Sequence, residues 1–382
     1  MPKNIIVIPT YWTRPVGQEN RSVETFYDHP TPVDGISTLP RLLKSVAALE
    51  GAAFSVLILT ATTHADLEQA AAARVETIIA PFRAQYPISQ ATETDAARIR
   101  QRHPHLAAHV QMRQYAGVRN LQLLLAHALG ADVIIALDDD EIVAPDYLQK
   151  ALHFMGQVHE GRRVLGVAGF YLDADGNITI PEQPRTGNIY LDKAAIMNEG
   201  MRALQGKNGR LTPTPIVFGG NMVFHRDLFT QIGFDPAITR GEDIDYLINA
   251  RIAGFEFWLD KELHITHLPP QQYNLPLYIK MAEDVRRFLY EQEKFRLAMA
   301  QGVQTPTIAE LSPYPGYFLA DDAADQAQIA LETIATPELM AAYGTPTEIV
   351  TLAQERAAHH APAYFEFAQS WPYLMDAVVN EA

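Results

Sequence analysis

The chain has 382 residues, of which 48% are hydrophobic and 20% charged, and its formal net charge is −15. This composition is typical of a globular enzyme with one large or two ordinary cores, and the acidic balance argues against nucleic acid or an anionic membrane surface as a partner. No apolar stretch reaches the roughly 20 residues of a membrane helix and the N-terminus lacks a signal-peptide layout, so we expect a cytoplasmic protein without a membrane span.

Cysteine is absent from the sequence. Disulfides and thiolate metal sites are therefore excluded, and any metal must be held by Asp, Glu, His, Asn or water. This ligand set favours Mg²⁺ or Mn²⁺ as the cofactor.

The first half of the chain alternates short apolar runs with helical patterns, which predicts an α/β fold. The expected order is strand, helix, strand, helix, strand, at residues 5–8, 39–49, 55–59, 65–73 and 77–80. Two long segments interrupt this order, residues 11–38 and residues 81–111, and the second contains a predicted helix at 93–102. Connections of this length are commonly functional.

A buried strand that ends in four acids is the most informative feature of the sequence. A helix is expected at residues 121–129, and an apolar run from residue 133 then leads into Asp138, Asp139, Asp140 and Glu141. A strand that is apolar on both faces is typical of the centre of a parallel sheet, whose carboxyl end binds ligands. Adjacent carboxylates repel one another, so we expect a cation there, which could receive a phosphate-bearing ligand. A P-loop protein is excluded because the chain has no Walker A loop.

Beyond the acids we expect a helix at 147–158, a strand at 164–170, a hairpin turn at 173–177 into 178–180, strand-like alternation at 255–266 and a helix at 277–300. The last helix begins an Ala-rich tail interrupted by prolines. We therefore divide the chain into a catalytic domain, residues 1–274, and a helical C-terminal extension, residues 275–382.

Three motifs follow one another in the sequence: the acidic strand end, a Gly219-Gly220-Asn221 segment, and Arg240-Gly241-Glu242-Asp243 followed by His264 and His267. Their order and spacing resemble the GT-A glycosyltransferases, above all glycosyltransferase family 2, over residues 4–270. The resemblance implies a Rossmann-like α/β fold with a mixed sheet flanked by helices.

The resemblance also implies which residues meet a nucleotide-sugar donor. The opening strand would end in a nucleotide-pocket turn, an Arg-Asn pair would open the helix before the acids with its Arg on the diphosphate, and the glycine motif would approach the sugar. Asp138 would face the ribose or the metal, whereas Asp139 is expected to point elsewhere. The implied donor-binding residues are Pro9, Thr10, Tyr11, Arg119, Asn120, Asp138, Asp139, Gly220 and Asn221. Ordinary turns, a surface Arg and a glycine bulge are the alternatives that the residues themselves leave open.

The implied metal ligands are Asp140, Asp138 and His267, with His267 preferred over His264. The implied catalytic residues are Asp243, as the base for the acceptor hydroxyl, and Glu242 beside it. Both acids could instead simply favour a helix start. Asp245 is expected to be a cap or surface residue.

Together these residues predict a metal-dependent transfer of a sugar from a UDP- or GDP-sugar to a hydroxyl of a small or carbohydrate acceptor. Family 2 implies inversion, although some retaining GT-A families share the acids and the late His. The chain lacks the Gln-x-x-Arg-Trp signature of processive synthases, which favours a single transfer. The alternatives are a sugar-1-phosphate nucleotidyltransferase and a non-catalytic carbohydrate or nucleotide-sugar binder. The sugar, the acceptor and the oligomeric state do not follow from the sequence.

Overall fold

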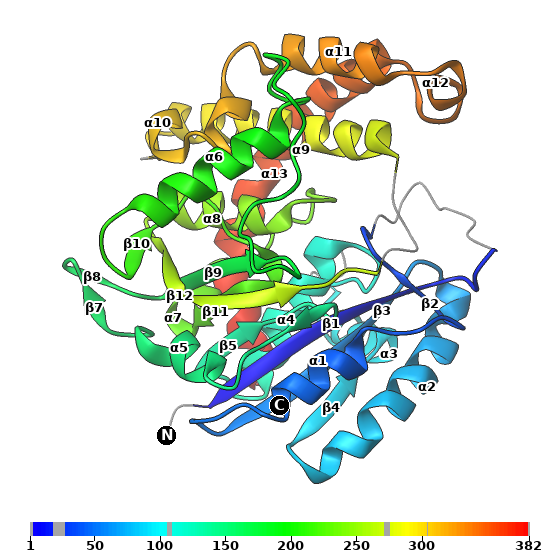
Figure 1. Ribbon diagram of the computed structural model, residues 1–382, viewed down its shortest axis with the longest axis vertical. Coiled ribbons are helices and arrows are strands. Elements are labelled where there is room, and N and C mark those ends of the chain that lie inside the picture. Colours follow the sequence, from blue (N-terminus) through cyan, green and yellow to red (C-terminus); the bar gives the residue numbers. More distant parts are fainter. Residues whose placement is uncertain (1–2, 18–26, 105–108, 271–275, 304, 381–382) are drawn as a thin grey trace.

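A computed structural model describes residues 3–17, 27–104, 109–270, 276–303 and 305–380 (Figure 1). In this part of the chain ten strands form one sheet with the order β10-β12-β9-β11-β5-β1-β3-β4, with β2 beside β1 and β6 beside β12. The strands of this sheet are β1 (Asn4–Thr13), β2 (Thr31–Pro32), β3 (Phe54–Thr62), β4 (Ile88–Ala91), β5 (Val133–Ala136), β6 (Glu141–Ile142), β9 (Gly166–Leu172), β10 (Leu211–Pro213), β11 (Met222–His225) and β12 (Phe257–His267). A separate hairpin consists of β7 (Val158–His159) and β8 (Arg162–Arg163).

Helices cover the sheet and extend beyond it. The helices of the first 274 residues are α1 (Leu39–Val46), α2 (Glu68–Ile79), α3 (Glu93–Arg102), α4 (Tyr115–Ala128), α5 (Tyr147–His153), α6 (Lys193–Gly206), α7 (Arg226–Phe229) and α8 (Glu242–Ile252). The later helices are α9 (Leu277–Ala300), α10 (Ile308–Leu311), α11 (Ala323–Ile334), α12 (Pro337–Tyr343) and α13 (Pro346–Asn380). Short 3₁₀ turns are η1 (Ala65–Leu67), η2 (Ala80–Ala84), η4 (Gly219–Asn221) and η5 (Gly316–Leu319).

The central strands are buried on both faces because successive side chains enter different cores. Along β1, Ile5 and Val7 belong to one hydrophobic cluster, whereas Ile6 and Ile8 belong to another on the opposite face. Helices α1, α2 and α5 supply the second cluster, and α4, α8, α9 and α13 supply the first. The predicted mixed α/β sheet flanked by helices is confirmed.

The strand directions bring several carboxyl ends to one edge of the sheet. β1 runs parallel to β3 and β5, and β9 runs parallel to β12. Because β11 is antiparallel to both β5 and β9, these two strands point the same way. The ends of β1, β5, β9 and β12 therefore meet at a single edge, where ligands bind in open α/β sheets.

The helical C-terminal extension is present and packs on the rest of the chain. Figure 1 shows α9, α10, α11 and α12 gathered with α6 above the sheet, while α13 descends from this layer. α13 packs on α9 and on α4, and the indole nitrogen of Trp371 donates a hydrogen bond to the carbonyl of Phe229 at 3.0 Å. α13 continues through Pro362 and Pro372. The domain boundary between residues 274 and 275 stays a prediction.

Several predicted elements were wrong or misplaced. Residues 77–79 are the last turn of α2, not a strand, because Ala71, Val75 and Ile79 are buried at a helical spacing of four. The third strand is β4, which lies inside the segment assigned to an insertion. Residues 178–180 form no strand, so the turn built on Asp173 closes no hairpin.

Two helices also differ in extent from the prediction. α4 begins at Tyr115, so Arg119 and Asn120 lie in its second turn and do not open it. α5 ends at His153 and not at residue 158. Parts of the long segments at 11–38 and 81–111, namely residues 18–26 and 105–108, lie outside the described residues.

None of the helices in the described ranges is both long and apolar enough to span a bilayer.

Candidate functional site

The acids that follow β5 lie at the edge where the parallel strands end. Asp138, Asp139 and Asp140 line a cavity of about 510 Å³. Glu141 is fully buried, and its Oε2 accepts a hydrogen bond from the backbone nitrogen of Asp138 at 3.0 Å. Burial and the charges of Asp138 and Asp140 raise the pKa of Glu141 well above its ordinary value. The four adjacent acids thus differ in their surroundings, because Asp138, Asp139 and Asp140 line the cavity, whereas Glu141 is enclosed.

The same cavity collects residues from all three sequence motifs. They come from the ends of β1 and β12, from α4, from η4 and from the start of α8. The motif residues that line it are Asp138, Asp139, Asp140, Gly219, Arg240, Gly241, Glu242, Asp243 and His267, and Tyr11, Arg119 and Phe218 line it beside them.

Asp139 lines the cavity, and its carboxylate is held by two hydroxyl groups. Its Oδ2 accepts a hydrogen bond from Thr10 Oγ1 at 2.5 Å, and its Oδ1 accepts one from Thr38 Oγ1 at 3.4 Å. Burial and the charge of Asp140 raise the pKa of Asp139 to about 8, against these hydrogen bonds. Thr10 and Thr38 hold this carboxylate toward the end of β1, whereas Asp138 contacts Arg119 and Asp140 contacts His267, so Asp139 points to other partners than its two neighbours do.

Asp140 and His267 form an acid and imidazole pair across two strands. His267 Nε2 lies 3.3 Å from Asp140 Oδ2. Burial alone would raise the pKa of Asp140, but the hydrogen bond and charge of His267 bring it below its ordinary value. Burial likewise opposes the charged form of His267, but Asp140 outweighs it and raises the pKa of the imidazole. His264 does not line the cavity formed by the described residues.

Arg119 connects the acidic strand end to the start of α8. Its Nη2 donates to Asp138 Oδ1 at 2.8 Å, and its Nε donates to Glu242 Oε1 at 3.2 Å. A third contact joins Nη1 to Gln122 Oε1 at 3.4 Å. The nearly buried guanidinium of Arg119 thus lies between two carboxylates, Asp138 of the acidic strand end and Glu242 of α8. A ligand that contacts Arg119 would therefore be close to both carboxylates.

Asp243 is oriented by two backbone amides. Its Oδ2 accepts a hydrogen bond from Gly219 N at 3.0 Å and its Oδ1 accepts one from Ile244 N at 2.8 Å. Beside it, burial raises the pKa of Glu242 to about 7, against the charge of Arg119 and with that of Asp243. The two backbone amides fix the orientation of the Asp243 carboxylate, whereas the carboxyl group of Glu242 changes protonation near neutral pH.

Asp245, expected at a cap or the surface, is enclosed. Its Oδ1 pairs with the buried ammonium of Lys294 on α9, and its Oδ2 accepts from Asn249 Nδ2 at 2.7 Å. Lys294 also reaches Asp235 at 3.0 Å. The expectation was wrong because α9 covers this face of α8, which the sequence of α8 alone does not reveal.

Five predicted donor-binding residues lie behind the wall of the cavity that the described residues form: Pro9, Thr10, Asn120, Gly220 and Asn221. The Asn120 amide exchanges hydrogen bonds with the backbone of Phe234 at 2.9 and 2.8 Å. The Asn221 amide accepts from Tyr147 Oη at 2.9 Å and donates to the carbonyl of Phe170 at 3.1 Å. These two side chains join segments of the frame and do not face the cavity.

The glycines of η4 are explained by close neighbours. A Cβ on Gly220 would collide with Glu141 Oε1 and would lie 2.5 Å from the hydroxyl oxygen of Tyr171. The amide of Gly220 donates to that hydroxyl at 2.7 Å. A Cβ on Gly219 would lie 2.6 Å from Nη2 of Arg119. A side chain at either position would therefore force these groups of the protein to move.

Tyr11 faces the cavity from within an aromatic group. Its ring centroid lies 4.3 Å from that of Tyr27 and 5.1 Å from that of Tyr115. Among the described residues its hydroxyl has no hydrogen-bond partner. Trp258, in contrast, is buried in the core and does not line this cavity.

The metal-ligating side chains of the cavity suit a divalent cation that is held partly by the protein and partly by the phosphates of a bound substrate. Within the described ranges no three His, Asp or Glu side chains gather as a complete metal site, and Asp138 is engaged by Arg119. Mg²⁺ and related ions commonly keep several waters and use only one or two carboxylates together with substrate phosphates. Asp140 and His267 suit this mode, whereas the predicted set of three ligands is not brought together.

Four cavity-lining cations have no role in the sequence-based prediction: Lys193, Arg240, Lys280 and Arg287. Three of them belong to α6 and α9, which carry no recognisable motif, and the fourth opens the third motif. Only Arg240 could have been found from the sequence, by its position beside Gly241.

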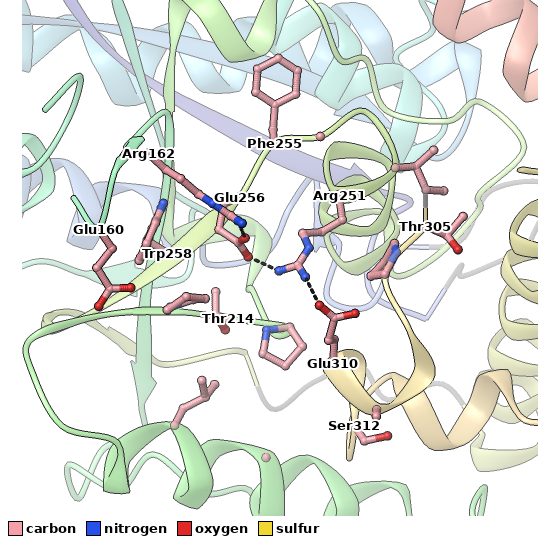
Figure 2. A pocket seen from close by; sticks show the side chains of 18 of the residues that line it. Glu160, Arg162, Thr214, Arg251, Phe255, Glu256, Trp258, Thr305, Glu310 and Ser312 are labelled. Carbon is pink, nitrogen blue, oxygen red and sulfur yellow. Dashed lines mark hydrogen bonds and ion pairs between the residues drawn. The ribbon is translucent and has the colours of Figure 1, made fainter. Parts of the chain in front are cut away.

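A larger cavity of about 1210 Å³ lies elsewhere, between β7, β8, α10 and the end of α8. Figure 2 shows that its charged side chains pair with one another: Glu256 lies between Arg162 and Arg251, and Glu310 also meets Arg251. None of the predicted site residues lines it. The larger cavity is therefore not the one that the sequence motifs share.

The chain is similar to proteins of known structure and to one protein-family model. No curated protein sequence matches the chain. Among solved structures it is similar to the mannosyltransferase PcManGT from Pyrobaculum calidifontis in complex with GDP-Man and Mn²⁺, with 12% identity, a TM-score of 0.46 and coverage of 99% of this chain and 87% of that one. It is also similar to S. aureus TarS 1-349 in complex with UDP, with 11% identity, a TM-score of 0.47 and coverage of 100% and 92%. At these TM-scores neither likeness assigns a ligand to this chain.

The match to a protein family covers most of the residues on which the sequence-based prediction rests. The model of the family described as Glycosyltransferase like family 2 matches residues 44–283, which is more than half of the chain. This range includes Arg119, the acidic strand end, η4 and the start of α8. The chain therefore belongs to the glycosyltransferase family 2-like proteins and is a glycosyltransferase.

Proposed function

We propose that the protein transfers a sugar from a UDP- or GDP-sugar to an acceptor hydroxyl in a metal-dependent, inverting, single-transfer reaction. The observation that carries the proposal is that Asp138, Asp139 and Asp140 share one cavity with Glu242 and Asp243. A transferase needs a group that receives the donor diphosphate and a base that receives the acceptor proton, both within reach of one sugar.

Asp140 and His267 are the residues that would hold Mn²⁺ or Mg²⁺. When bound, the ion supplies positive charge to the departing nucleoside diphosphate. Tyr11, near the end of β1, and Asp139, which follows β5 and contacts Thr10 of β1, would receive the nucleoside. Asp138 and Arg119 lie between these residues and α8, where the sugar would stand.

Asp243 is the proposed base. The hydrogen bonds from Gly219 N and Ile244 N hold one oxygen each and leave lone pairs on both. Asp243 would accept the proton of the acceptor hydroxyl as that oxygen attacks the anomeric carbon. Since the attacking oxygen and the leaving diphosphate need opposite faces of the sugar, one such displacement inverts the anomeric configuration.

The donor half of the proposal is tested by thermal stabilisation with UDP, GDP, CDP and dTDP, each with and without Mn²⁺. We expect one diphosphate to stabilise the wild type only with metal, by about 2.7 kcal/mol at a hundred times its dissociation constant. Asp140→Ala should abolish this effect, and Asp146→Ala, a half-exposed acid paired with Lys150, should not. Metal-independent stabilisation, or stabilisation that survives Asp140→Ala, would contradict the metal assignment.

The catalytic half is tested with Asp243→Asn. We expect the turnover number to fall by roughly 10²–10⁴-fold, as for loss of a general base, while nucleoside diphosphate affinity stays within about twofold. Asp325→Asn on α11 is the control, and the product anomer, read by NMR, tests inversion. Unchanged turnover in Asp243→Asn would remove this residue as the base. Release of pyrophosphate in place of a nucleoside diphosphate would instead identify a nucleotidyltransferase.

A further inference from the structure

The larger cavity, of about 1210 Å³, has no part in the reaction proposed above. It lies between the β7–β8 hairpin, the second half of α6, β10, the end of α8 and α10 (Figure 1). Helix α8 joins the two cavities, since Glu242 at its start lines the smaller one and Arg251 near its end lines the larger one. α8 has 11 residues and is therefore about 16 Å long. A ligand held at Arg251 thus lies at the far end of α8 from the proposed base.

A row of alternating charges crosses the larger cavity (Figure 2). Glu256, just after α8, accepts hydrogen bonds from Arg162 of β8 and from Arg251 of α8. Glu310 of α10 lies 3.5 Å from Arg251 and ends the row. Each guanidinium is matched by a carboxylate, so the row does not favour an ionic ligand. An apolar ligand would take these charges out of water without replacing the lost contacts. The row therefore favours a neutral polar ligand.

The other charged side chains of the lining leave this preference unchanged. Arg163 pairs with Asp227 at 2.6 Å. Lys207 Nζ donates to the carbonyl of Pro213 at 3.3 Å. Glu160, in the turn between β7 and β8, is 68% exposed. Lys207 and Glu160 carry opposite charges, so they too give the lining no preference for one sign.

Hydrogen-bond donors and acceptors lie side by side along the row. A guanidinium has five N–H groups, whereas the pairs use one nitrogen of Arg162 and two of Arg251. The side chains of Arg162 and Glu310 are 66% and 54% exposed, so a ligand can reach both. A hydroxyl group donates one hydrogen bond and accepts others. Neighbouring hydroxyls of one molecule would therefore match a guanidinium and a carboxylate at the same time.

The remaining wall is apolar and stiff. Leu204 and Trp258 contribute buried apolar side chains. The indole N–H of Trp258 has no hydrogen-bond partner among the described residues, and a ligand oxygen beside it would supply an acceptor. Proline fixes the backbone angle φ, so prolines keep such a wall in shape. The prolines that line the cavity are Pro213, Pro215, Pro306 and Pro313.

A neutral molecule with many hydroxyls and some apolar surface fits this lining, and saccharides have this chemistry. The chain belongs to a family of sugar transferases, which makes saccharides the relevant molecules of this kind. The cavity is larger than the roughly 300–1,000 Å³ of common small-molecule pockets, so it has room for several sugar residues. We propose that the larger cavity is a second saccharide site, separate from the donor site, which binds a neutral oligosaccharide.

The test measures binding of four neutral trisaccharides by calorimetry on the full chain: maltotriose, cellotriose, mannotriose and tri-N-acetylchitotriose. Each is titrated alone and with saturating nucleoside diphosphate and Mg²⁺. We expect at least one to bind with one-to-one stoichiometry and with an affinity that agrees within about twofold in the two conditions. Binding by none of the four would overturn the proposal. Loss of binding in the presence of the nucleoside diphosphate would place the saccharide in the smaller cavity and would overturn it as well.

Two variants locate the binding. Ala203 is an exposed residue of α6 that lines the cavity, so Ala203→Trp fills the space from the surface and should weaken binding by tenfold or more. Arg162→Gln removes one end of the charged row and should weaken binding several-fold. The matched controls are Ala341→Trp, at an exposed position of α12, and Arg202→Gln, whose side chain is 57% exposed and pairs with Glu182. Neither control should change the affinity, and unaltered binding in Ala203→Trp would contradict the assignment to this cavity.

The class of ligand is tested with trigalacturonate, a trisaccharide that carries three carboxylates. It should bind more weakly than the best neutral trisaccharide, and tighter binding would show that the cavity selects an anion. The outcome is independent of the donor. If no nucleoside diphosphate binds, the proposed function fails, whereas the trisaccharide titrations still decide whether the larger cavity is a saccharide site.

Discussion

Gly219 shows how a single residue controls the geometry of the site. Its amide orients Asp243, and its α-carbon stands against the guanidinium of Arg119, which links Asp138 to Glu242. A methyl group here would push Arg119 away from both acids. Glycine is thus favoured at position 219 because a side chain would displace the guanidinium of Arg119, and not because the backbone is strained.

We expect Gly219→Ala to weaken nucleoside diphosphate binding by about tenfold, or about 1.4 kcal/mol, and to destabilise the fold by about 1–3 kcal/mol through overpacking. Calorimetric titration and urea unfolding measure the two effects. Gly206→Ala is the matched control, because a Cβ on Gly206 meets nothing within 4 Å in the described structure. Equal nucleotide affinity in wild type and Gly219→Ala would show that the position of Arg119 does not matter for the donor.

At the scale of elements, α9 carries an acid that makes stability depend on pH. Glu291 is fully buried between Arg287 and Lys294, and neither carboxylate oxygen has a hydrogen bond within the described residues. Burial raises its pKa to about 8, against the charges of both cations. The folded protein therefore keeps a proton that the unfolded chain loses near pH 4.5. This contribution to stability is complete below about pH 4.5 and is lost as pH rises through about 8.

We expect the free energy of unfolding of the wild type to fall between pH 5 and pH 9, with Glu291 contributing on the order of a few kcal/mol at about 1.4 kcal/mol per pKa unit. Burial also raises the pKa values of Glu242 and Asp245, to about 7 and about 6, so these groups act in the same direction. Glu291→Gln should flatten the pH dependence, and Glu293→Gln, whose carboxylate pairs with Arg296, should leave it unchanged. Urea unfolding at several pH values is the measurement, and identical slopes for wild type and Glu291→Gln would contradict the protonated state.

The elements also show which parts of the structure the sequence could predict. The acidic strand end was found because an apolar run into four acids is a local pattern, and β5 with Asp138 to Asp140 at the cavity agrees with it. Residues 77–79 were misassigned because two adjacent isoleucines fit either a strand or the last turn of a helix. The pairs Lys193 with Asp284 and Asp245 with Lys294 join helices far apart in sequence, so no local pattern announces them. The pairing of Lys193 with Asp284 and the burial of Asp245 therefore required the tertiary fold.

At the scale of the whole molecule, the C-terminal extension and the sheet share one core. A single hydrophobic cluster contains Ile134 of β5, Phe288 of α9 and Trp371 of α13. Gly233 leaves room for the ring of Trp371, which a Cβ there would approach to 2.6 Å. α9 in addition lines the cavity of the candidate site through Met281 and Asp284. Since α9 belongs both to this core and to the wall of the cavity, we infer that folding and ligand binding are coupled across residue 274.

We therefore expect one cooperative unfolding transition, with far-ultraviolet circular dichroism and tryptophan fluorescence coinciding. Trp371→Ala should destabilise this whole transition by about 3–5 kcal/mol, because it leaves a cavity and removes the hydrogen bond to Phe229. Tyr373→Ala on the same helix is the control, since that side chain is 77% exposed and should cost little. Stabilisation by the nucleoside diphosphate should raise the midpoint of both signals together. Two separate transitions, with only the first shifted by Trp371→Ala and only the second by nucleotide, would show instead that the extension folds independently of the catalytic part.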